Sequence, residues 1–384
     1  MFAKTYANKK VLITGNTGFK GAWLSLWLKQ LGASICGYSL DIPTSPSLYS
    51  CLNLASICKQ YFADIKDADH LRQVIHQEKP DFIFHLAAQA IVATSYTNPT
   101  ETILTNAIGT MNLCEALRTV THPCVVLVIT SDKCYENIES LWGYKETDNL
   151  GGKDIYSASK AAAENIFHAY HHSFLKKMPH IRLASARAGN VIGGGDWAAN
   201  RIIVDCVKAW NHHEAVVIRN PHATRPWQHV LEPLSAYLTL GQHLFTSKTK
   251  IASCDGEAFN FGPRAEQNRQ VHEVLVDLYE HWDKKITGPC FKIIADQQFY
   301  EAGLLKLNCD KALYHLQWSA TLDYQKTIEY VGSWYNNYYC HANSDMLTFT
   351  LQQITDYEKQ RHKTHPHEQR VTSAILQSRP EISL

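Results

Sequence analysis

Residues 10–32 read KVLITGNTGFKGAWLSLWLKQLG, and this stretch decides the fold of the chain. A short apolar run leads into a turn that holds three glycines spaced three apart, and an amphipathic segment follows. Because glycine has no side chain, the backbone of such a turn can approach a pyrophosphate, whose negative charge is favoured at a helix N-terminus. The alternative is a tight strand-to-helix turn without a ligand. The residues predicted to bind a dinucleotide here are Gly15, Thr17, Gly18, Phe19 and Gly21.

The alternation of apolar runs and helix-like segments continues to about Arg187. Strands that alternate with helices form a parallel sheet with helices on both faces. We therefore predict an α/β fold, a Rossmann-type doubly wound parallel sheet. The expected strands are VLIT at 11–14, ICGY at 35–38, FIFHLAA at 82–88, VVLVIT at 125–130 and RLASAR at 182–187.

The pattern of the sequence changes after Arg187, where loops rich in glycine and tryptophan replace the regular alternation of apolar runs and helix-like segments. We expect residues 1–187 to form the dinucleotide-binding domain, with segments returning to it after residue 216. Residues 188–340 are expected to form mainly a smaller, C-terminal substrate-binding α/β region. Residues 341–384 are rich in Gln, Lys, His and Ser, which predicts a peripheral helix followed by a loose polar tail.

The composition excludes several classes of partner. A net charge of +1, with 45% hydrophobic and 19% charged residues, gives no electrostatic case for nucleic acid or membrane binding. The 11 cysteines include no CxxC pair, and the 20 histidines have no neighbours at metal-ligand spacing. The N-terminus lacks the apolar region and cleavage site of a secretory signal. We expect a cytoplasmic protein with free thiols and without a metal site.

An acidic residue after the second strand indicates the cofactor. Asp41 follows this strand closely enough to accept hydrogen bonds from an adenosine ribose, although a solvated carboxylate is the alternative. No arginine follows this strand to neutralise a 2′-phosphate, which favours NAD over NADP. Asp64 and Ile65 are candidate contacts for the adenine ring, or else Asp64 caps a helix. Small residues at the end of the third expected strand would let the cofactor approach: Ala87, Ala88 and, directly after them, Gln89.

Tyr156 and Lys160 stand four residues apart in YSASKAAAE. On one helix the two side chains face the same way, about one turn apart. A cationic lysine beside a phenol lowers a phenol pKa that begins near ~10, so the tyrosine can accept a proton from a sugar hydroxyl. The pair is also predicted to contact the cofactor. The alternative is an exposed tyrosine and lysine on a surface helix.

Three polar residues follow the fourth expected strand: Ser131, Asp132 and Lys133. Open α/β sheets build their sites at the carboxyl ends of the strands. Ser131 is expected to hydrogen-bond a sugar oxygen and Asp132 to act as a general acid. Lys133 is expected to act as a base or an electrostatic stabiliser. A polar loop without a catalytic role is the alternative.

With these motifs in place, the sequence resembles the CDP-glucose 4,6-dehydratases, members of the extended short-chain dehydrogenases/reductases. The resemblance covers roughly Lys10 to Gly262, and Lys133 directly after Asp132 is characteristic of the CDP branch. The motifs that carry it are TSDKCYEN, WGYKETDNLGG, YSASK, RAGNVIGGGDWA and NPHATRPWQHVLEPL.

The resemblance implies a redox-neutral reaction. Tyr156 removes the C4 hydroxyl proton while hydride passes to NAD, water is eliminated across C5 and C6 with Asp132 as the acid, and the hydride returns to C6. It also implies a homodimer or homotetramer that pairs through helices around residues 106–118 and 158–171. The residues expected to hold the sugar nucleotide are Ser95, Asn190, Arg201 and Arg225, one of the two arginines being structural in the alternative.

The loop around Ser95 departs from the family pattern, because Ala93 and Thr94 replace basic residues that the resemblance leads us to expect. Two other readings stay open, the first because the glycine turn and YxxxK serve all enzymes of this superfamily, the second because of the altered loop. One is an epimerase or a dehydratase acting on a different sugar nucleotide, and the other is a catalytically silent NAD-binding regulator. Asp132 and Lys133 favour elimination, because a 4-epimerase has no task for an acid and a base at C5 and C6.

Overall fold

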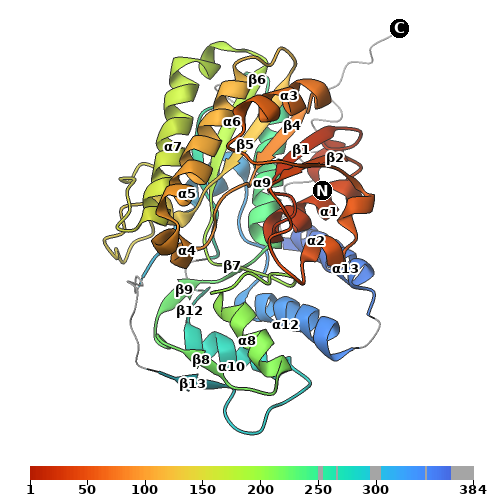
Figure 1. Cartoon of the computed structure of the whole chain (residues 1–384), viewed down its shortest axis with the longest axis vertical. Coiled ribbons are helices and arrows are strands. Elements are labelled where there is room, and N and C mark those ends of the chain that lie inside the picture. Colours follow the sequence, from red (N-terminus) through yellow and green to blue (C-terminus); the bar gives the residue numbers. More distant parts are fainter. Residues whose placement is uncertain (250–253, 265–266, 295–303, 342–343, 365–384) are drawn as a thin grey trace.

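The computed structural model describes residues 1–249, 254–264, 267–294, 304–341 and 344–364. Its centre is a seven-stranded sheet in the order β11-β6-β5-β4-β1-β2-β3, in which every neighbouring pair is parallel (Figure 1). The predicted fold class is confirmed. The strands are β1 (Lys10–Thr14), β2 (Ser34–Ser39), β3 (Cys58–Phe62), β4 (Phe82–His85), β5 (Cys124–Ile129), β6 (Ile181–Arg187) and β11 (Ala258–Asn260).

All five strands expected from the sequence are present in this sheet, and two of its strands were missed. β3 lies at one edge of the sheet and reads CKQYF, in which only Cys58 is fully buried. An edge strand with exposed positions needs no continuous apolar run, so its sequence gives a weak signal. β11 has three residues and lies at the opposite edge, where it pairs with β6.

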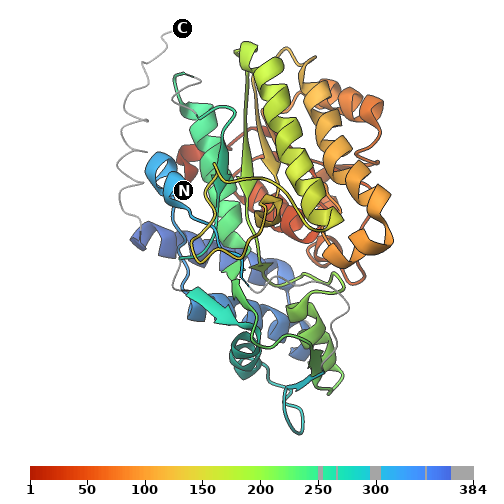
Figure 2. The ribbon, with the colours of Figure 1, turned by 90° about the vertical axis from the view of Figure 1, so that its left-hand side faces the viewer.

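Helices cover both faces of the sheet (Figures 1 and 2). One face carries three helices that pack on one another and the other carries two. The first set is α3 (Ala68–Glu78), α6 (Gly109–Leu117) and α7 (Ile155–Ser173), and the second is α1 (Phe19–Gln30) and α9 (Leu231–Thr246). Shorter helices precede α6: α4 (Val92–Thr97), α5 (Pro99–Ile103) and a π-helical turn, η3 (Leu104–Ile108).

The side chains of the central strands alternate between the two faces. In β1, Val11 and Ile13 join the core beneath α1 and α9, whereas Leu12 joins the core beneath α3, α6 and α7. Phe84 and Ile83 of β4 divide in the same way. Because both faces are buried, these strands read as continuous apolar runs.

A second, smaller region lies below the sheet in Figure 1. It contains α8 (Ile202–Asn211), α10 (Val271–Glu280) and α12 (Tyr324–Cys340), with three two-stranded sheets. The pairs are β7 (Val191–Ile192) with β10 (Gln228–His229), β8 (Val216–Ile218) with β13 (Phe291–Ile293), and β9 (Thr224–Pro226) with β12 (Asn268–Gln270). The chain passes between the two regions more than once, because α9 and β11 return to the main sheet. The division at residues 187 and 340 stays a prediction.

The last described helix is α13 (Met346–Thr364), which packs against α1 and α12. The indole Nε1 of Trp27 in α1 donates to Glu358 at 2.8 Å, and Tyr357 and Arg361 are completely buried. The remaining part of the predicted polar tail, residues 365–384, lies outside the described residues. No helix in the described part of the chain has the length and apolar character needed to span a membrane.

Candidate active site

The glycine turn between β1 and α1 is built so closely that side chains would not fit. Gly15 has a φ of +74°, and a Cβ at Gly21 would lie 2.2 Å from the carbonyl oxygen of Gly15. α1 begins directly after Gly18, and no side chain caps its first turn. The N–H groups of this turn and the positive end of the helix dipole suit the pyrophosphate of NAD.

Neighbouring strands brace this turn. The hydroxyl of Thr17 donates to the carbonyl oxygen of Asp41 at 2.6 Å, and Ser39 donates to the side chain of Asn16 at 2.7 Å. The carboxylate of Asp41 is exposed on the segment after β2. The turn and the expected ribose-binding segment are therefore held together before any ligand arrives.

Asp64 and Ile65, which are predicted to contact adenine, also make contacts within the protein. Asp64 accepts a hydrogen bond from the backbone N–H of Lys66 at 2.9 Å and lies 3.3 Å from the ammonium group of Lys66. The helix α3 is capped by Asp67 and not by Asp64. Ile65 is buried, and its side chain packs against Gly109 of α6. Its role toward adenine stays a prediction.

The loop after β4 lies beside the glycine turn. The backbone N–H of Ala87 donates to Thr14 at 3.1 Å, and a Cβ at Gly15 would meet the backbone of Ala87 at 2.8 Å. Ala88 is half-buried. The side chain of Gln89 is used within the loop, since it accepts from the N–H of Ile91 at 2.5 Å and donates to Thr102 at 2.9 Å.

The catalytic candidates from two elements meet at the carboxyl end of β5. Ser131 caps the short helix η4 (Asp132–Cys134), and its hydroxyl donates to Asp132 at 2.9 Å. Ser131 also hydrogen-bonds the phenol of Tyr156 in α7. Lys160 lies one turn farther along α7, and both α7 side chains are buried. Lys133 is half-buried, and its backbone N–H donates to Ser131 at 3.2 Å.

Asp132 has one oxygen without a partner. Its side chain is 2% exposed, and Oδ2 is buried with no hydrogen bond from any described residue. The carboxylate packs against Gly189, where a Cβ would lie 1.9 Å from Oδ2. A cavity of about 460 Å³ opens beside it, with Gly189 and Gln228 in its wall. A buried, unpartnered carboxyl oxygen is costly unless a ligand or water meets it.

The ionisation of the pair in α7 differs from the sequence prediction. Burial raises the pKa of Tyr156 to about 12, although the hydrogen bond with Ser131 lowers it. Burial also lowers the pKa of Lys160 to about 8, while Cys134 and Glu164 raise it. The expected lowering of the phenol pKa by lysine is therefore corrected, because desolvation disfavours both charged forms.

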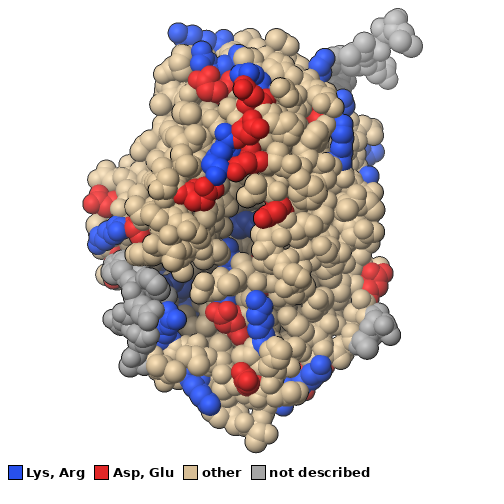
Figure 3. Space-filling view, viewed as in Figure 1, with Lys and Arg blue, Asp and Glu red and all other residues tan. Residues whose placement is uncertain are grey.

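Two charged residues of the cleft were missed by the sequence analysis. Lys20, in the first turn of α1, lies within electrostatic reach of Lys160, Asp132, Asp196 and Arg201. Burial, followed by Arg201 and Lys160, lowers its pKa to about 7. Figure 3 shows this face hollowed between the two regions, with Lys and Arg atoms in the depth of the hollow. The sequence carried a signal for this residue, because Lys20 is a charged residue within the glycine turn.

The second missed residue is Asp196, from the segment GGGDW. It is buried, lies 3.3 Å from Nε of Arg201, and its pKa is raised by burial against the effect of Arg201. Of the predicted substrate contacts, Arg201 thus faces the catalytic residues and also lies within electrostatic reach of Tyr156. Arg201 directly precedes the first residue of α8, so the loop before this helix positions its side chain.

The other predicted substrate contacts lie on three elements. Asn190 follows β6 with a φ of +49°, and its carbonyl oxygen accepts from the N–H of Gln228 at 3.2 Å. Arg225 is in β9, opposite Arg269 of β12. Ser95 is buried in α4 and donates to the carbonyl of Val92 at 2.7 Å. Within the described ranges, no cluster of three His, Cys, Asp or Glu residues could hold a metal.

Comparisons with known proteins agree with this geometry. The family model described as GDP-mannose 4,6 dehydratase matches residues 12–331. CDP-glucose 4,6-dehydratase of Salmonella typhimurium is 41% identical over 356 residues, which are 92% of this chain and 97% of that protein. The resemblance to the CDP-glucose 4,6-dehydratases is thereby confirmed.

Solved structures share the fold. dTDP-glucose 4,6-dehydratase from Bacillus anthracis, in complex with NAD, superposes with a TM-score of 0.71 at 19% identity over 89% of this chain and 99% of that chain. The epimerase Mth375 from Methanothermobacter thermautotrophicus gives a TM-score of 0.72 at 20% identity over 92% and 96%. The chain therefore belongs to the NAD-dependent epimerase/dehydratase family of extended short-chain dehydrogenases/reductases, which includes the CDP-glucose 4,6-dehydratases.

Proposed function

We propose that this protein converts CDP-glucose to CDP-4-keto-6-deoxyglucose and water, with NAD as its cofactor. The near full-length likeness to the Salmonella enzyme supports the substrate. The observation that carries the reaction type is the buried carboxyl of Asp132, whose Oδ2 has no partner, beside Tyr156 and Ser131. An oxidised C4 acidifies C5, and an acid beside C6 then allows the hydroxyl to leave as water.

Each residue of the site has a proposed task. Tyr156, hydrogen-bonded to Ser131, removes the proton of the C4 hydroxyl, and the ammonium of Lys160, one turn farther along α7, would favour the phenolate against the effect of burial. Asp132 donates a proton to the departing C6 hydroxyl. Lys133 abstracts the C5 proton or stabilises the charge that follows. NAD supplies hydride acceptance at C4 and hydride return at C6, so the reaction is redox-neutral.

The chain holds the two ligands from opposite sides of the cleft. Gly15, Gly18 and Gly21 would cradle the NAD pyrophosphate at the N-terminus of α1. Arg201 and Arg225 would hold the diphosphate of the sugar nucleotide, because a guanidinium group matches phosphate oxygens.

The test is a panel of substrates. Purified protein is incubated with NAD and, separately, with CDP-, dTDP-, UDP- and GDP-glucose, and products are identified by mass. Loss of one water from CDP-glucose alone is the expected result. Conversion of another nucleotide would reassign the specificity, epimerised sugar without loss of water would support an epimerase, and NAD binding without turnover would support a silent regulator.

A pair of variants separates the two halves of the reaction. Asp132→Asn should still allow oxidation at C4, so the near-ultraviolet absorbance of reduced nicotinamide should appear on adding CDP-glucose while water loss slows by about 10²–10⁴-fold. Tyr156→Phe should abolish both signals to a similar degree. Equal loss of oxidation in both variants would contradict the assignment of Asp132 to elimination.

We also infer a cytoplasmic, deoxysugar-forming enzyme that assembles as a homodimer or homotetramer. All 11 cysteines are free thiols, which is typical of a reducing compartment. The oligomer would form through the segments at 106–118 and 158–171. Light scattering on the purified protein measures its mass, and a value equal to one chain would contradict the assembly.

A further inference from the structure

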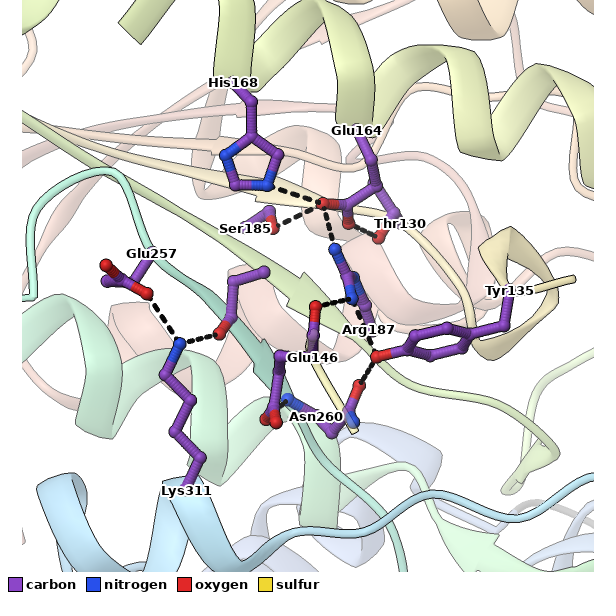
Figure 4. A network of polar contacts seen from close by, with 11 residues as sticks. Thr130, Tyr135, Glu146, Glu164, His168, Ser185, Arg187, Glu257, Asn260 and Lys311 are labelled. Carbon is purple, nitrogen blue, oxygen red and sulfur yellow. Dashed lines mark hydrogen bonds and ion pairs between the residues drawn. The ribbon is translucent and has the colours of Figure 1, made fainter. Parts of the chain in front are cut away.

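Behind the catalytic candidates lies a buried ion pair that the proposed mechanism does not use. Glu164 of α7 is 0% exposed and Arg187 at the end of β6 is 1% exposed, with Oε2 of Glu164 and Nη2 of Arg187 2.9 Å apart (Figure 4). Burying two charges carries a large desolvation cost, and replacing such a pair by apolar residues is often neutral or stabilising. We therefore expect the Glu164–Arg187 pair to have a role other than stability.

Both oxygens of Glu164 are fully engaged. Oε1 accepts from the hydroxyl of Thr130 at 2.5 Å, and Oε2 accepts from the hydroxyl of Ser185 at 2.8 Å as well as from Arg187. Burial would raise the pKa of Glu164, but Arg187 and these hydrogen bonds hold it below its usual value. The side chain is thus an ionised carboxylate that ties α7 to the ends of β5 and β6.

The residues it holds lie close in the chain to predicted site residues. Thr130 immediately precedes Ser131, and Arg187 lies three residues before Asn190. The guanidinium of Arg187 also donates to the hydroxyl of Tyr135 at 2.7 Å, three residues after Asp132. Figure 4 shows these side chains converging from the sheet, α7 and the loop after β5.

On α7 itself, Tyr156, Lys160 and Glu164 follow at intervals of four and so share one face of the helix. The titratable groups that face Lys160 come from four elements: Lys20 of α1, His85 of β4, Cys134 of η4 and Glu164 of α7. Among these, Glu164 is the carboxylate, and it favours the ammonium form of Lys160.

We propose that Glu164, paired with Arg187, is a positioning residue that fixes Tyr156 and Lys160 against the Ser131–Asp132 loop and keeps the Lys160 ammonium charged. In this role the pair would touch neither substrate nor cofactor. It acts through the backbone of three elements and through the charge on Lys160. The inference deepens the proposed dehydration and rests on it for its kinetic readout, but its titration readout is independent of any substrate.

The test is Glu164→Gln, which keeps the shape but removes the charge. The titration of Lys160 is followed by NMR on protein isotope-labelled at the lysine ε-carbon, with the resonance assigned by its loss in Lys160→Met. We expect the Lys160 pKa to fall by about one unit, because the variant loses a nearby anion and leaves the Arg187 cation uncompensated. Because the ammonium is then lost at a lower pH, the alkaline limb of the pH profile of kcat/KM for CDP-glucose should move to lower pH, and kcat at neutral pH should fall about tenfold while KM stays constant.

Glu232→Gln is the matched control, since Glu232 is a buried carboxylate of α9 whose contacts are Thr321, Leu322 and Tyr357. It should lower the melting temperature and leave the pKa of Lys160 and the pH profile unchanged. If Glu164→Gln does not fold, the double variant Thr130→Val with Ser185→Ala removes two donors without a charge, and kcat should fall with KM constant.

An unchanged Lys160 titration together with an unchanged pH profile in Glu164→Gln would overturn the inference. So would equal kcat in the wild type and the Thr130→Val, Ser185→Ala variant. If the wild type itself does not dehydrate CDP-glucose, the proposed function fails, and the Lys160 titration still decides the electrostatic role of Glu164.

Discussion

Lys20 is the residue whose position says most about cofactor binding. It lies in the first turn of α1, and its pKa is lowered to about 7 by burial and by two other cations. A bound pyrophosphate favours the ammonium form, so binding of NAD should take up a proton. Below its pKa the lysine is already charged, and above it the proton must be supplied. We therefore expect NAD affinity to fall about tenfold from about pH 6 to about pH 9, measured by titration calorimetry.

Lys20→Met should flatten this pH dependence, whereas Lys29→Met at the exposed far end of the same helix should retain it. The same slope in Lys20→Met as in the wild type would mean that another group controls the affinity.

At the scale of the element, two glycines of the β1–α1 turn are needed for different reasons. A Cβ at Gly21 would meet the carbonyl oxygen of Gly15 at 2.2 Å, whereas a Cβ at Gly18 would lie 3.4 Å from the same oxygen. Gly21→Ala should thus force the turn apart and destabilise the fold by about 2 kcal/mol or more, measured by urea unfolding. Gly18→Ala should keep the stability but weaken NAD binding, because its added methyl faces the expected pyrophosphate.

The two variants check each other. Equal stability of Gly21→Ala and the wild type would show that the turn relaxes freely, and unchanged NAD affinity in Gly18→Ala would place the pyrophosphate elsewhere.

At the scale of the whole molecule, α13 packs against α1 and α12 and reaches α9 through the side chain of Tyr357. The hydroxyl of Tyr357 lies 2.9 Å from the buried carboxylate of Glu232 in α9, and Glu232 also accepts from the backbone N–H of Thr321 and Leu322. Tyr357→Phe should reduce the free energy of unfolding by about 1–3 kcal/mol, because it removes a hydrogen bond to a buried carboxyl group. Thermal unfolding gives the measurement.

Tyr314→Phe is the control for this change, since the Tyr314 side chain is 78% exposed and should leave the melting temperature unaltered. Equal melting temperatures for Tyr357→Phe and the wild type would mean that α13 contributes no stability through this contact.

The sequence alone determined the sheet, the cofactor and the family. Buried parallel strands read as apolar runs, the glycine turn has a steric requirement that few other sequences meet, and YxxxK places two side chains on one helical face. These are local properties of the chain. The edge strand β3 was missed because its exposed residues carry no such pattern.

Only the tertiary structure decided which distant residues share the cleft and how they ionise. Lys20, Asp132 and Asp196 come from three segments far apart in the chain, and burial raises the pKa of Tyr156 where the neighbouring lysine had predicted a lowering. The Glu164–Arg187 pair likewise joins α7 to β6. Desolvation and long-range ion pairing depend on what surrounds a group in space, and neighbours along the chain do not reveal that.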